Sequence, residues 1–244
     1  MSETLLDVLH EHDLELPANA VEQLDAYRQL LWAWNEQLNL TRHTDLQRFV
    51  TRDIYDSIQL AEYLQPDEEV LDVGSGGGVP GIVLSVLRPD LSVELSESVG
   101  KKARALDDMV AKLGLAVPVH HARAEDVLDD FRYHTLCVRA VSGMSKLLTW
   151  FEHKWASFDR LLLIKGPRWV EERGEARHRG LMRDLQLRKL DDYETPTTGA
   201  QSVVLEVRLR PARAVLRLVC QRGGKILDLF PEPFSIHSLN LPDH

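Results

Sequence analysis

The chain has 244 residues, of which 44% are hydrophobic, and a formal net charge of −9. This length and apolar content suffice for one globular domain with its own core. The acidic balance argues against indiscriminate binding to nucleic acid, because phosphates repel carboxylates. No window approaches about twenty apolar residues, and the acidic start lacks the basic-then-apolar order of a signal peptide. We therefore expect a cytoplasmic protein without a membrane partner.

The N-terminal part is predicted to be helical. Apolar and aromatic residues recur at helical spacing between residues 20 and 38, which predicts an amphipathic helix whose aromatic rings belong to the core. A further helix is expected to lead into Leu64, before the turn at Pro66.

Beyond Pro66 the pattern alternates between short apolar runs and amphipathic segments. Strands are expected at residues 70–73, 91–95, 117–120, 135–138, 161–164 and 203–209. Helices are expected near residues 81–88, 101–113, 144–155 and 170–185. This alternation predicts an α/β fold with a mostly parallel sheet, helices on both faces and an N-terminal helical extension.

The domain organisation is predicted to be simple. Residues 1–210 are expected to form a single domain that includes the N-terminal helices, at about residues 1–65. Residues 211–244 are expected to form a tail, whose latter part carries Pro231, Pro233 and Pro242 and reads as irregular.

The two cysteines, Cys137 and Cys220, lie far apart and show no metal-ligand spacing. Cys137 falls inside an apolar strand candidate, and Cys220 lies near the tail. In a cytoplasmic protein such cysteines stay reduced, so we expect neither a disulfide nor a metal site.

One segment departs from the acidic average. From Arg160 to Lys189 there are nine cations and only four acids. A basic face on an acidic protein fits a structured RNA partner, whereas a solvated helix face is the simpler interpretation of the same charges.

A glycine-rich loop directly follows the first predicted strand. The string from Val70 to Gly81 is VLDVGSGGGVPG, and a helix is expected to begin at Gly81. Glycine takes positive φ at low cost and lets a ligand approach the main chain closely. The order strand, glycine loop, helix therefore predicts a nucleotide-type cofactor site, with a plain glycine-rich turn as the alternative.

Neighbouring residues help to separate two cofactor classes. A dinucleotide site needs Gly-x-Gly-x-x-Gly followed at once by a helix, whereas here Pro80 comes just before the helix. Asp72 fits the Asp-x-Gly-x-Gly pattern of S-adenosylmethionine-dependent methyltransferases. Glu97, at the end of the second strand, is placed to accept both ribose hydroxyls of either cofactor. The Asp72 pattern favours the methyl donor.

Several strings between Leu30 and Leu209 resemble one family in their order and spacing. They are WNEQLNLT, Arg52 with Asp56-Ser57, VGSGGGVPGIVLSVLRPD, ESVGKKARAL, ARAED, VRAV and LIKG. Together they resemble the RsmG (GidB) family, which methylates guanine N7 in small-subunit ribosomal RNA. The resemblance implies a Rossmann-like class I methyltransferase fold, S-adenosylmethionine as cofactor, and ribosomal RNA or the small ribosomal subunit as partner.

Site residues follow from the loop and from this resemblance. The expected cofactor-binding residues are Gly74, Gly76, Gly78, Val79, Glu97, Ala124, Glu125 and Arg139. They come after the carboxyl ends of predicted strands, where open α/β sheets bind ligands. Ala124 is small enough for adenine to lie flat. Glu125 or a nearby backbone group can bond the adenine amino group, although an acid there also fits a helix N-terminus.

The expected chemistry needs no general base, because guanine N7 carries a lone pair and no proton. Catalysis then depends on holding acceptor nitrogen, methyl carbon and sulfur in line. Arg139 and Lys165 are the expected catalytic residues, binding phosphate or the carbonyl oxygen beside N7. Strand-end salt bridges are the alternative role for both.

The chain departs from the family pattern on the substrate side. Where the family has Arg-His before Asp-Ser, this chain has Arg52-Asp53, and Gln201-Ser202 replaces Arg-His near the last strand. Each change removes a possible RNA contact. Two other functions therefore stay open: methylation of another RNA or a small molecule, and a catalytically silent protein that binds RNA or a ribosome-assembly partner.

Overall fold

The computed structural model describes residues 3–139 and 141–211. Within these residues one seven-stranded sheet has the order β3-β2-β1-β4-β5-β7-β6. Its strands are β1 (Glu69–Val73), β2 (Ser92–Ser96), β3 (Val119–His120), β4 (Tyr133–Arg139), β5 (Phe158–Lys165), β6 (Leu185–Glu194) and β7 (Gln201–Leu209). Strands β1 to β5 pair in parallel, while β7 is antiparallel to both β5 and β6. The predicted mostly parallel sheet is confirmed.

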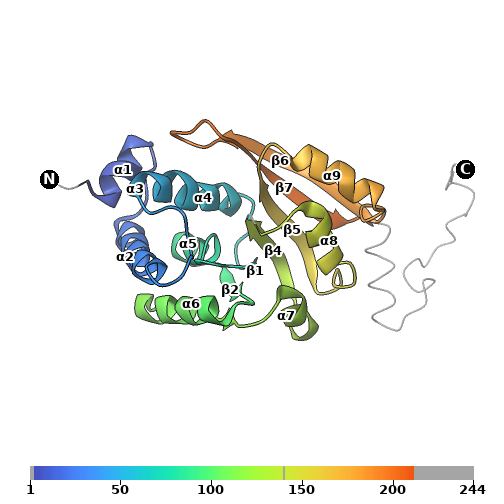
Figure 1. Cartoon of the computed structure of the whole chain (residues 1–244), viewed down its shortest axis with the longest axis horizontal. Coiled ribbons are helices and arrows are strands. Elements are labelled where there is room, and N and C mark those ends of the chain that lie inside the picture. Colours follow the sequence, from blue (N-terminus) through green and yellow to red (C-terminus); the bar gives the residue numbers. More distant parts are fainter. Residues whose placement is uncertain (1–2, 140, 212–244) are drawn as a thin grey trace, which may run out of the picture.

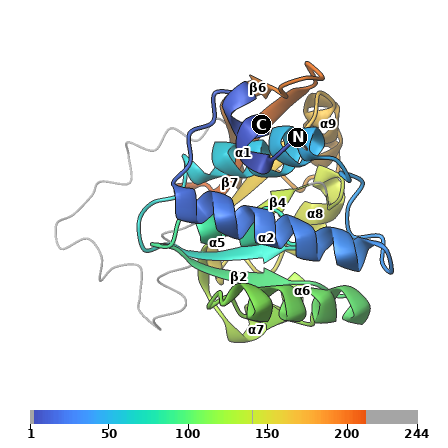
Figure 2. The ribbon, with the colours of Figure 1, turned by 90° about the vertical axis from the view of Figure 1, so that its left-hand side faces the viewer.

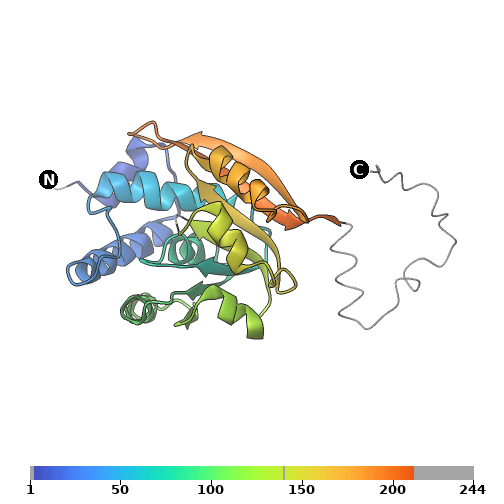
Figure 3. The same ribbon diagram turned by 45° about the vertical axis from the view of Figure 1, so that its right-hand side comes forward.

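Helices cover both faces of this sheet, as Figures 1 and 3 show. They are α1 (Leu5–Glu11), α2 (Ala18–Asn35), α3 (Leu46–Arg48), the π-helical turn η1 (Phe49–Ile54), α4 (Tyr55–Ala61), α5 (Gly81–Leu87), α6 (Gly100–Leu113), α7 (Ala124–Asp130), α8 (Met144–Trp150) and α9 (Trp169–His178). Alternate residues of the buried strands face opposite layers. Val70 packs in the core under the N-terminal helices, and its neighbour Leu71 packs in the core under α7, α8 and α9.

The N-terminal helices are part of the first of these cores. Helix α2 crosses one side of the molecule and packs against α5 and α6 (Figure 2). Its buried residues Leu24, Tyr27 and Leu31 share a cluster with sheet residues such as Val93. Helix α1 starts with a capping box in which Thr4 bonds the backbone of Asp7. The predicted helix over residues 20–38 is thus present, but it ends at Asn35.

Some predicted boundaries are wrong, mostly where the sequence is polar. Strand β6 was not predicted because it lies at the sheet edge, where its outward side chains are charged. The helix predicted to reach residue 185 ends at His178, and Gly180 then takes a φ of +76°. No bounds were predicted for α1 within the helical N-terminal part, and α7 was missed.

The remaining observations concern membrane-spanning helices, metal ligands, the two cysteines and the tail. Among the helices of the described ranges, none combines the length and apolar character that crossing a membrane requires. Those ranges also hold no group of three or more potential metal ligands. Cys137 is buried, and burial raises the pKa of its thiol. Cys220 and nearly all of the predicted tail lie outside the described residues.

Candidate active site

The glycine loop joins the end of β1 to the start of α5. Gly74, Gly76 and Gly78 have φ values of +66°, +57° and +103°, which explains why glycine is needed there. A Cβ atom added to Gly76 would meet only the carbonyl oxygen of Gly74, at 3.7 Å. The backbone at Gly76 therefore borders open space, as a loop that receives a ligand requires.

Asp72 fixes the return of this loop to the helix. Its carboxyl group is buried and accepts a hydrogen bond from the Gly81 backbone N–H at 3.0 Å. Its carbonyl oxygen accepts bonds from the hydroxyls of Ser75 and Ser96, at 3.0 and 3.1 Å. Burial raises the pKa of Asp72 to about 7, although the Gly81 bond lowers it. Through these hydrogen bonds Asp72 fixes the conformation of the loop at Ser75 and at Gly81.

This raised pKa gives Asp72→Asn an expected pH signature. The folded state holds the proton up to about pH 7, whereas the unfolded state loses it near pH 4. Asp72 therefore costs stability as pH rises between those values, and asparagine, which can still accept the Gly81 bond, does not. The free energy of unfolding of the variant should rise relative to the parent, by up to about 4 kcal/mol, between pH 4 and pH 7.

Urea titration at several pH values measures this difference. Asp90→Asn is the matched control, because Arg88 lowers the pKa of that surface carboxyl. Its ionised form is favoured by folding, and that contribution is already complete above about pH 4, so the difference between control and parent should stay level from about pH 4 to pH 7. A pH-independent difference for Asp72→Asn would contradict the assigned protonation.

Glu97, just after β2, is bound to the loop from the other side. One oxygen of its carboxylate accepts the Gly76 N–H at 3.0 Å, and the other accepts the Val99 N–H at 2.7 Å. The side chain is buried, with 6% exposure for the residue. Each oxygen keeps a second lone pair, so Glu97 can still accept ribose hydroxyls while it holds the loop.

A small pocket lies beside the loop and between strand ends. We call it the loop pocket; its volume is about 70 Å³, and it is lined by Val73, Gly74, Ser96, Ser98, Ala122, Arg123, Ala124, Glu125, Val141 and Trp150. Of the predicted cofactor residues, Gly74, Ala124 and Glu125 meet here. Glu125 is ion-paired with Arg123 at 2.5 Å and also lies in the first turn of α7, so both predicted roles are compatible with its position.

The other predicted cofactor residues do not line this pocket. Val79 is half-buried and packs against the core under the N-terminal helices. Arg139 lines a neighbouring cavity instead. The segment after β4 lies between the two cavities, because Val141 lines the first and Ser142 lines the second.

This second cavity, the charged cleft, has a volume of about 570 Å³. It is lined by His43, Arg52, Asp56, Arg139, Ser142, Gly143, Ile164, Lys165, Gly166, Pro167, Glu172, Ala200, Gln201 and Ser202. Both predicted catalytic residues, Arg139 at the end of β4 and Lys165 at the end of β5, therefore face one cavity.

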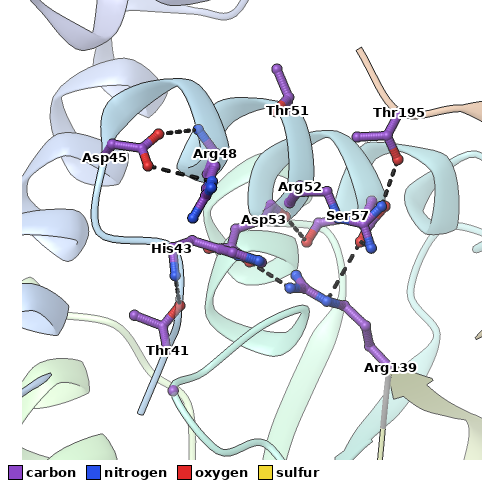
Figure 4. Close-up of polar contacts among 12 residues, drawn as sticks. Thr41, His43, Asp45, Arg48, Thr51, Arg52, Asp53, Ser57, Arg139 and Thr195 are labelled. Atoms are coloured by element: carbon purple, nitrogen blue, oxygen red, sulfur yellow. Dashed lines mark hydrogen bonds and ion pairs between the residues drawn. The ribbon is translucent and has the colours of Figure 1, made fainter. Parts of the chain in front are cut away.

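Arg139 is held by two buried carboxylates. It reaches from β4 toward Asp53, as Figure 4 shows, and donates to an oxygen of Asp53 at 2.5 Å. Its Nε lies 3.5 Å from Asp56, and the Nη1 atom is buried without a hydrogen-bond partner in the described residues. Burial lowers the pKa of Arg139, but Asp53 and Asp56 raise it, and the net direction is upward. Nη1 is thus a buried donor that no described residue satisfies.

Asp53 consequently has a different role from the one that the sequence comparison indicated. It was interpreted only as the loss of a possible RNA contact, because the family has histidine there. The residue is 1% exposed, and its Oδ1 atom also lies 2.9 Å from Nδ1 of His43. Asp53 thus binds two residues that line the cleft.

Lys165 is likewise held by other residues of the protein. Its ammonium group donates to the Ser142 carbonyl at 2.5 Å and to Glu172 of α9 at 2.9 Å. The same oxygen of Glu172 accepts the backbone N–H of Met144 at 2.8 Å. Lys165 and Glu172 together fix the segment between β4 and α8, which is the strand-end salt-bridge role.

The basic segment does not form one face near this site. Arg160 is 7% exposed, and its guanidinium binds Glu68 at 2.7 Å, so the prediction is wrong for this residue. Arg177 lines a separate cavity with Leu185 and Arg210. Leu185 pairs with the end of β7, at the edge where the parallel strands begin. That part of the segment lies opposite the cleft.

Sequence reasoning missed three residues that shape the cleft: His43, Asp53 and Glu172. Asp53 was seen as a departure from the family pattern, and its charge could have indicated a cationic partner. His43 lies in a loop, and only proximity in the fold links it to Asp53. Glu172 has other charged residues next to it in the sequence, and nothing in the sequence distinguishes it from them.

Comparison with known proteins identifies the family to which the chain belongs. Residues 20–199 match the family model GidB, described as rRNA small subunit methyltransferase G. A protein of Rhodopirellula baltica called ribosomal RNA small subunit methyltransferase G is 56% identical over 185 residues, which cover 76% of this chain and 80% of that protein. The protein of the same name from Halorhodospira halophila is 36% identical, over 84% of this chain and 94% of that protein.

Solved structures support the fold alone. A variant of MtNAS in complex with S-adenosylmethionine superposes with a TM-score of 0.53 at 16% identity, covering 85% of this chain and 84% of that one. M. capricolum TrmK in complex with S-adenosyl-homocysteine has a TM-score of 0.51 at 10% identity, covering 64% and 68%. Given the family match and the two relatives, the chain belongs to the rRNA small subunit methyltransferase G (GidB) family.

Proposed function

We propose that this chain transfers the methyl group of S-adenosylmethionine to N7 of a guanine in small-subunit ribosomal RNA. The observation that supports this most is the adjacency of two cavities. The loop pocket borders the glycine loop, the charged cleft borders the ends of β4 and β5, and the segment after Arg139 separates them. A methyl donor in one cavity and an acceptor base in the other would meet at that segment.

The residues around the loop fit the proposed cofactor. S-adenosylmethionine supplies an electrophilic methyl group on a cationic sulfur. Ala124 and Glu125 would hold adenine, Glu97 the ribose, and the loop from Gly74 through Gly76 and Gly78 to Val79 the methionine part. The loop pocket of about 70 Å³ holds only part of such a molecule. The remainder would extend along the loop toward Arg139, past the open space at Gly76.

The chemistry requires alignment and little else. The N7 lone pair forms the new bond to carbon, the carbon–sulfur bond breaks, and its electron pair stays on sulfur as a neutral thioether. Positive charge thereby moves onto the base, so a cation bonded to N7 would oppose the reaction. The pairing of Arg139 with Asp53, and of Lys165 with Glu172, limits that opposition.

We assign different roles to the two predicted catalytic residues. Arg139 would contact a ligand oxygen through its free Nη1 atom, either the cofactor carboxylate or the carbonyl oxygen of the base. Lys165 would act as a positioning residue, because its bonds to Ser142 and Glu172 fix the wall between the cavities. Since the substrate belongs to the ribosome, the proposed place of action is the cytoplasm.

The test uses small ribosomal subunits purified from cells that lack this methyltransferase. They are incubated with the protein and S-adenosylmethionine, and the nucleosides of the ribosomal RNA are analysed by mass spectrometry. One additional 7-methylguanosine per subunit is the expected result, and none without the cofactor. Methylation at another atom, or none on subunits and naked RNA alike, would overturn the proposal.

A further inference from the structure

His43 is held rigidly in the wall of the charged cleft. Its backbone N–H donates to the Thr41 hydroxyl at 3.0 Å, and its carbonyl accepts the indole N–H of Trp32 at 3.0 Å. Its ring binds Asp53 through Nδ1 at 2.9 Å, and the side chain is 23% exposed. Backbone and ring are both fixed, as in a preorganised ligand contact.

The contact with Asp53 sets the hydrogen position on the ring. The oxygen that faces His43 also accepts from Arg139, so it is an acceptor, and Nδ1 must carry the proton. In the neutral ring Nε2 then presents a lone pair. Across residues 3–139 and 141–211, no hydrogen-bond partner is found for Nε2. The ring lines the cleft, so this acceptor is available there.

The charges of the cleft favour a base over a phosphate. Each lining cation has a carboxylate partner: Arg52 lies 3.7 Å from Asp56, Arg139 lies 2.5 Å from Asp53, and Lys165 lies 2.9 Å from Glu172. A phosphate site needs cations in excess. A pocket of paired charges with a free acceptor suits an uncharged ring that carries N–H donors.

We infer that His43 accepts the N1–H of the target guanine and so distinguishes guanine from adenine. The inference rests on the proposed function. Guanine carries a hydrogen on N1, whereas adenine has a lone pair there, which would face the lone pair of Nε2. An unpaired polar group inside a site rejects the wrong ligand more strongly than a lost apolar contact does.

The same contact would favour the reaction. As the methyl group moves to N7, the base gains positive charge, and its N1–H becomes a stronger donor. The hydrogen bond to the neutral ring therefore strengthens in the transition state, and the Asp53 carboxylate supports the charge that builds on His43.

The test compares pH profiles of kcat/KM on unmethylated small subunits. Acid favours the protonated ring, and a protonated Nε2 is a donor that cannot accept N1–H. Activity of the parent should therefore fall on the acid side. The groups that share this environment are Asp53, Asp56, Arg52, Arg139, Lys165 and Glu172. All of them stay present in the variants compared.

His43→Gln keeps an acceptor oxygen but has no group that binds a proton. It should retain kcat/KM within about tenfold at neutral pH and lose the acid fall. His43→Phe removes the acceptor and should lower kcat/KM by about ten- to hundredfold at every pH. Cofactor affinity, measured by calorimetry, should be unchanged in both. Thermal unfolding shows whether either variant is folded.

His12→Gln is the matched control, because His12 also forms a side-chain hydrogen bond, to Gln47 at 2.9 Å, but does not line the cleft. Its pH profile should equal that of the parent. An acid fall that persists in His43→Gln, a parent without one, or a folded His43→Phe with parental kcat/KM overturns the role of His43. A parent that produces no 7-methylguanosine at any pH overturns the proposed function itself.

Discussion

Arg139→Leu should lower the free energy of unfolding by about 3 to 5 kcal/mol, because it leaves buried carboxylates without their partner. Asp53 is 1% exposed and Asp56 is 0% exposed, and both lie within 4 Å of the guanidinium. Burial already raises the pKa of Asp56, and Arg139 opposes that rise. Urea denaturation measures the loss, which should be partly restored by the double variant with Asp53→Asn.

Arg160→Leu separates this structural effect from a functional one. Arg160 is also buried, and it binds Glu68 and Glu206 at the other end of the sheet. Its loss should cost a similar amount of stability. Under conditions where both variants are folded, only Arg139→Leu should weaken S-adenosylmethionine binding and methyl transfer. Equal activity of the two folded variants would show that Arg139 has no contact with ligands.

The parts of the fold that could be predicted are those where burial governs the sequence. The strand at 70–73 reads as a continuous apolar run because both of its faces are covered, and it was found almost to the residue. Strand β6 faces solvent along much of its length, so charged residues such as Lys189 conceal it. Sequence patterns report burial, and they fail at an exposed edge.

The candidate site divides in the same way. The positions of Gly74 and Lys165 could be predicted because both residues stand at the carboxyl ends of strands. In a parallel sheet these ends lie along one edge, where ligands bind. Their partners come from elements far away in the chain: Asp53 lies 86 positions before Arg139. A pairing of this kind depends on how the N-terminal helices pack onto the sheet. Local sequence patterns therefore do not show that Asp53 and Arg139 lie side by side.

This limit explains why Arg139 was expected to bind phosphate or the carbonyl oxygen beside N7, with a salt bridge only as the alternative. Counting charges along the chain treats each cation as exposed, whereas in the cleft each lies near a carboxylate. The same applies to Arg160, which was counted in a basic face and is buried in an ion pair. A cation in a sequence indicates nucleic-acid binding only if its neighbours in space are known.

Gly76→Val should lower the affinity for S-adenosylmethionine by about ten- to hundredfold or more, because the new side chain fills space that the proposed cofactor needs. The protein itself leaves that space open, since an added Cβ meets only the Gly74 carbonyl at 3.7 Å. The φ of +57° also strains a β-branched residue, at a cost of about 1 to 2 kcal/mol of stability. Calorimetry with S-adenosylmethionine and S-adenosylhomocysteine measures the affinity.

Gly114→Val is the matched control for this prediction. Gly114 ends helix α6 with a φ of +64°, and an added Cβ there meets nothing within 4 Å. The two substitutions therefore share the backbone strain and the open surroundings, and only Gly76 borders the proposed methionine site. Gly114→Val should lose similar stability and bind both ligands like the parent. If Gly76→Val also binds them like the parent, the cofactor does not lie along the glycine loop, and the residues assigned to it must be reconsidered together.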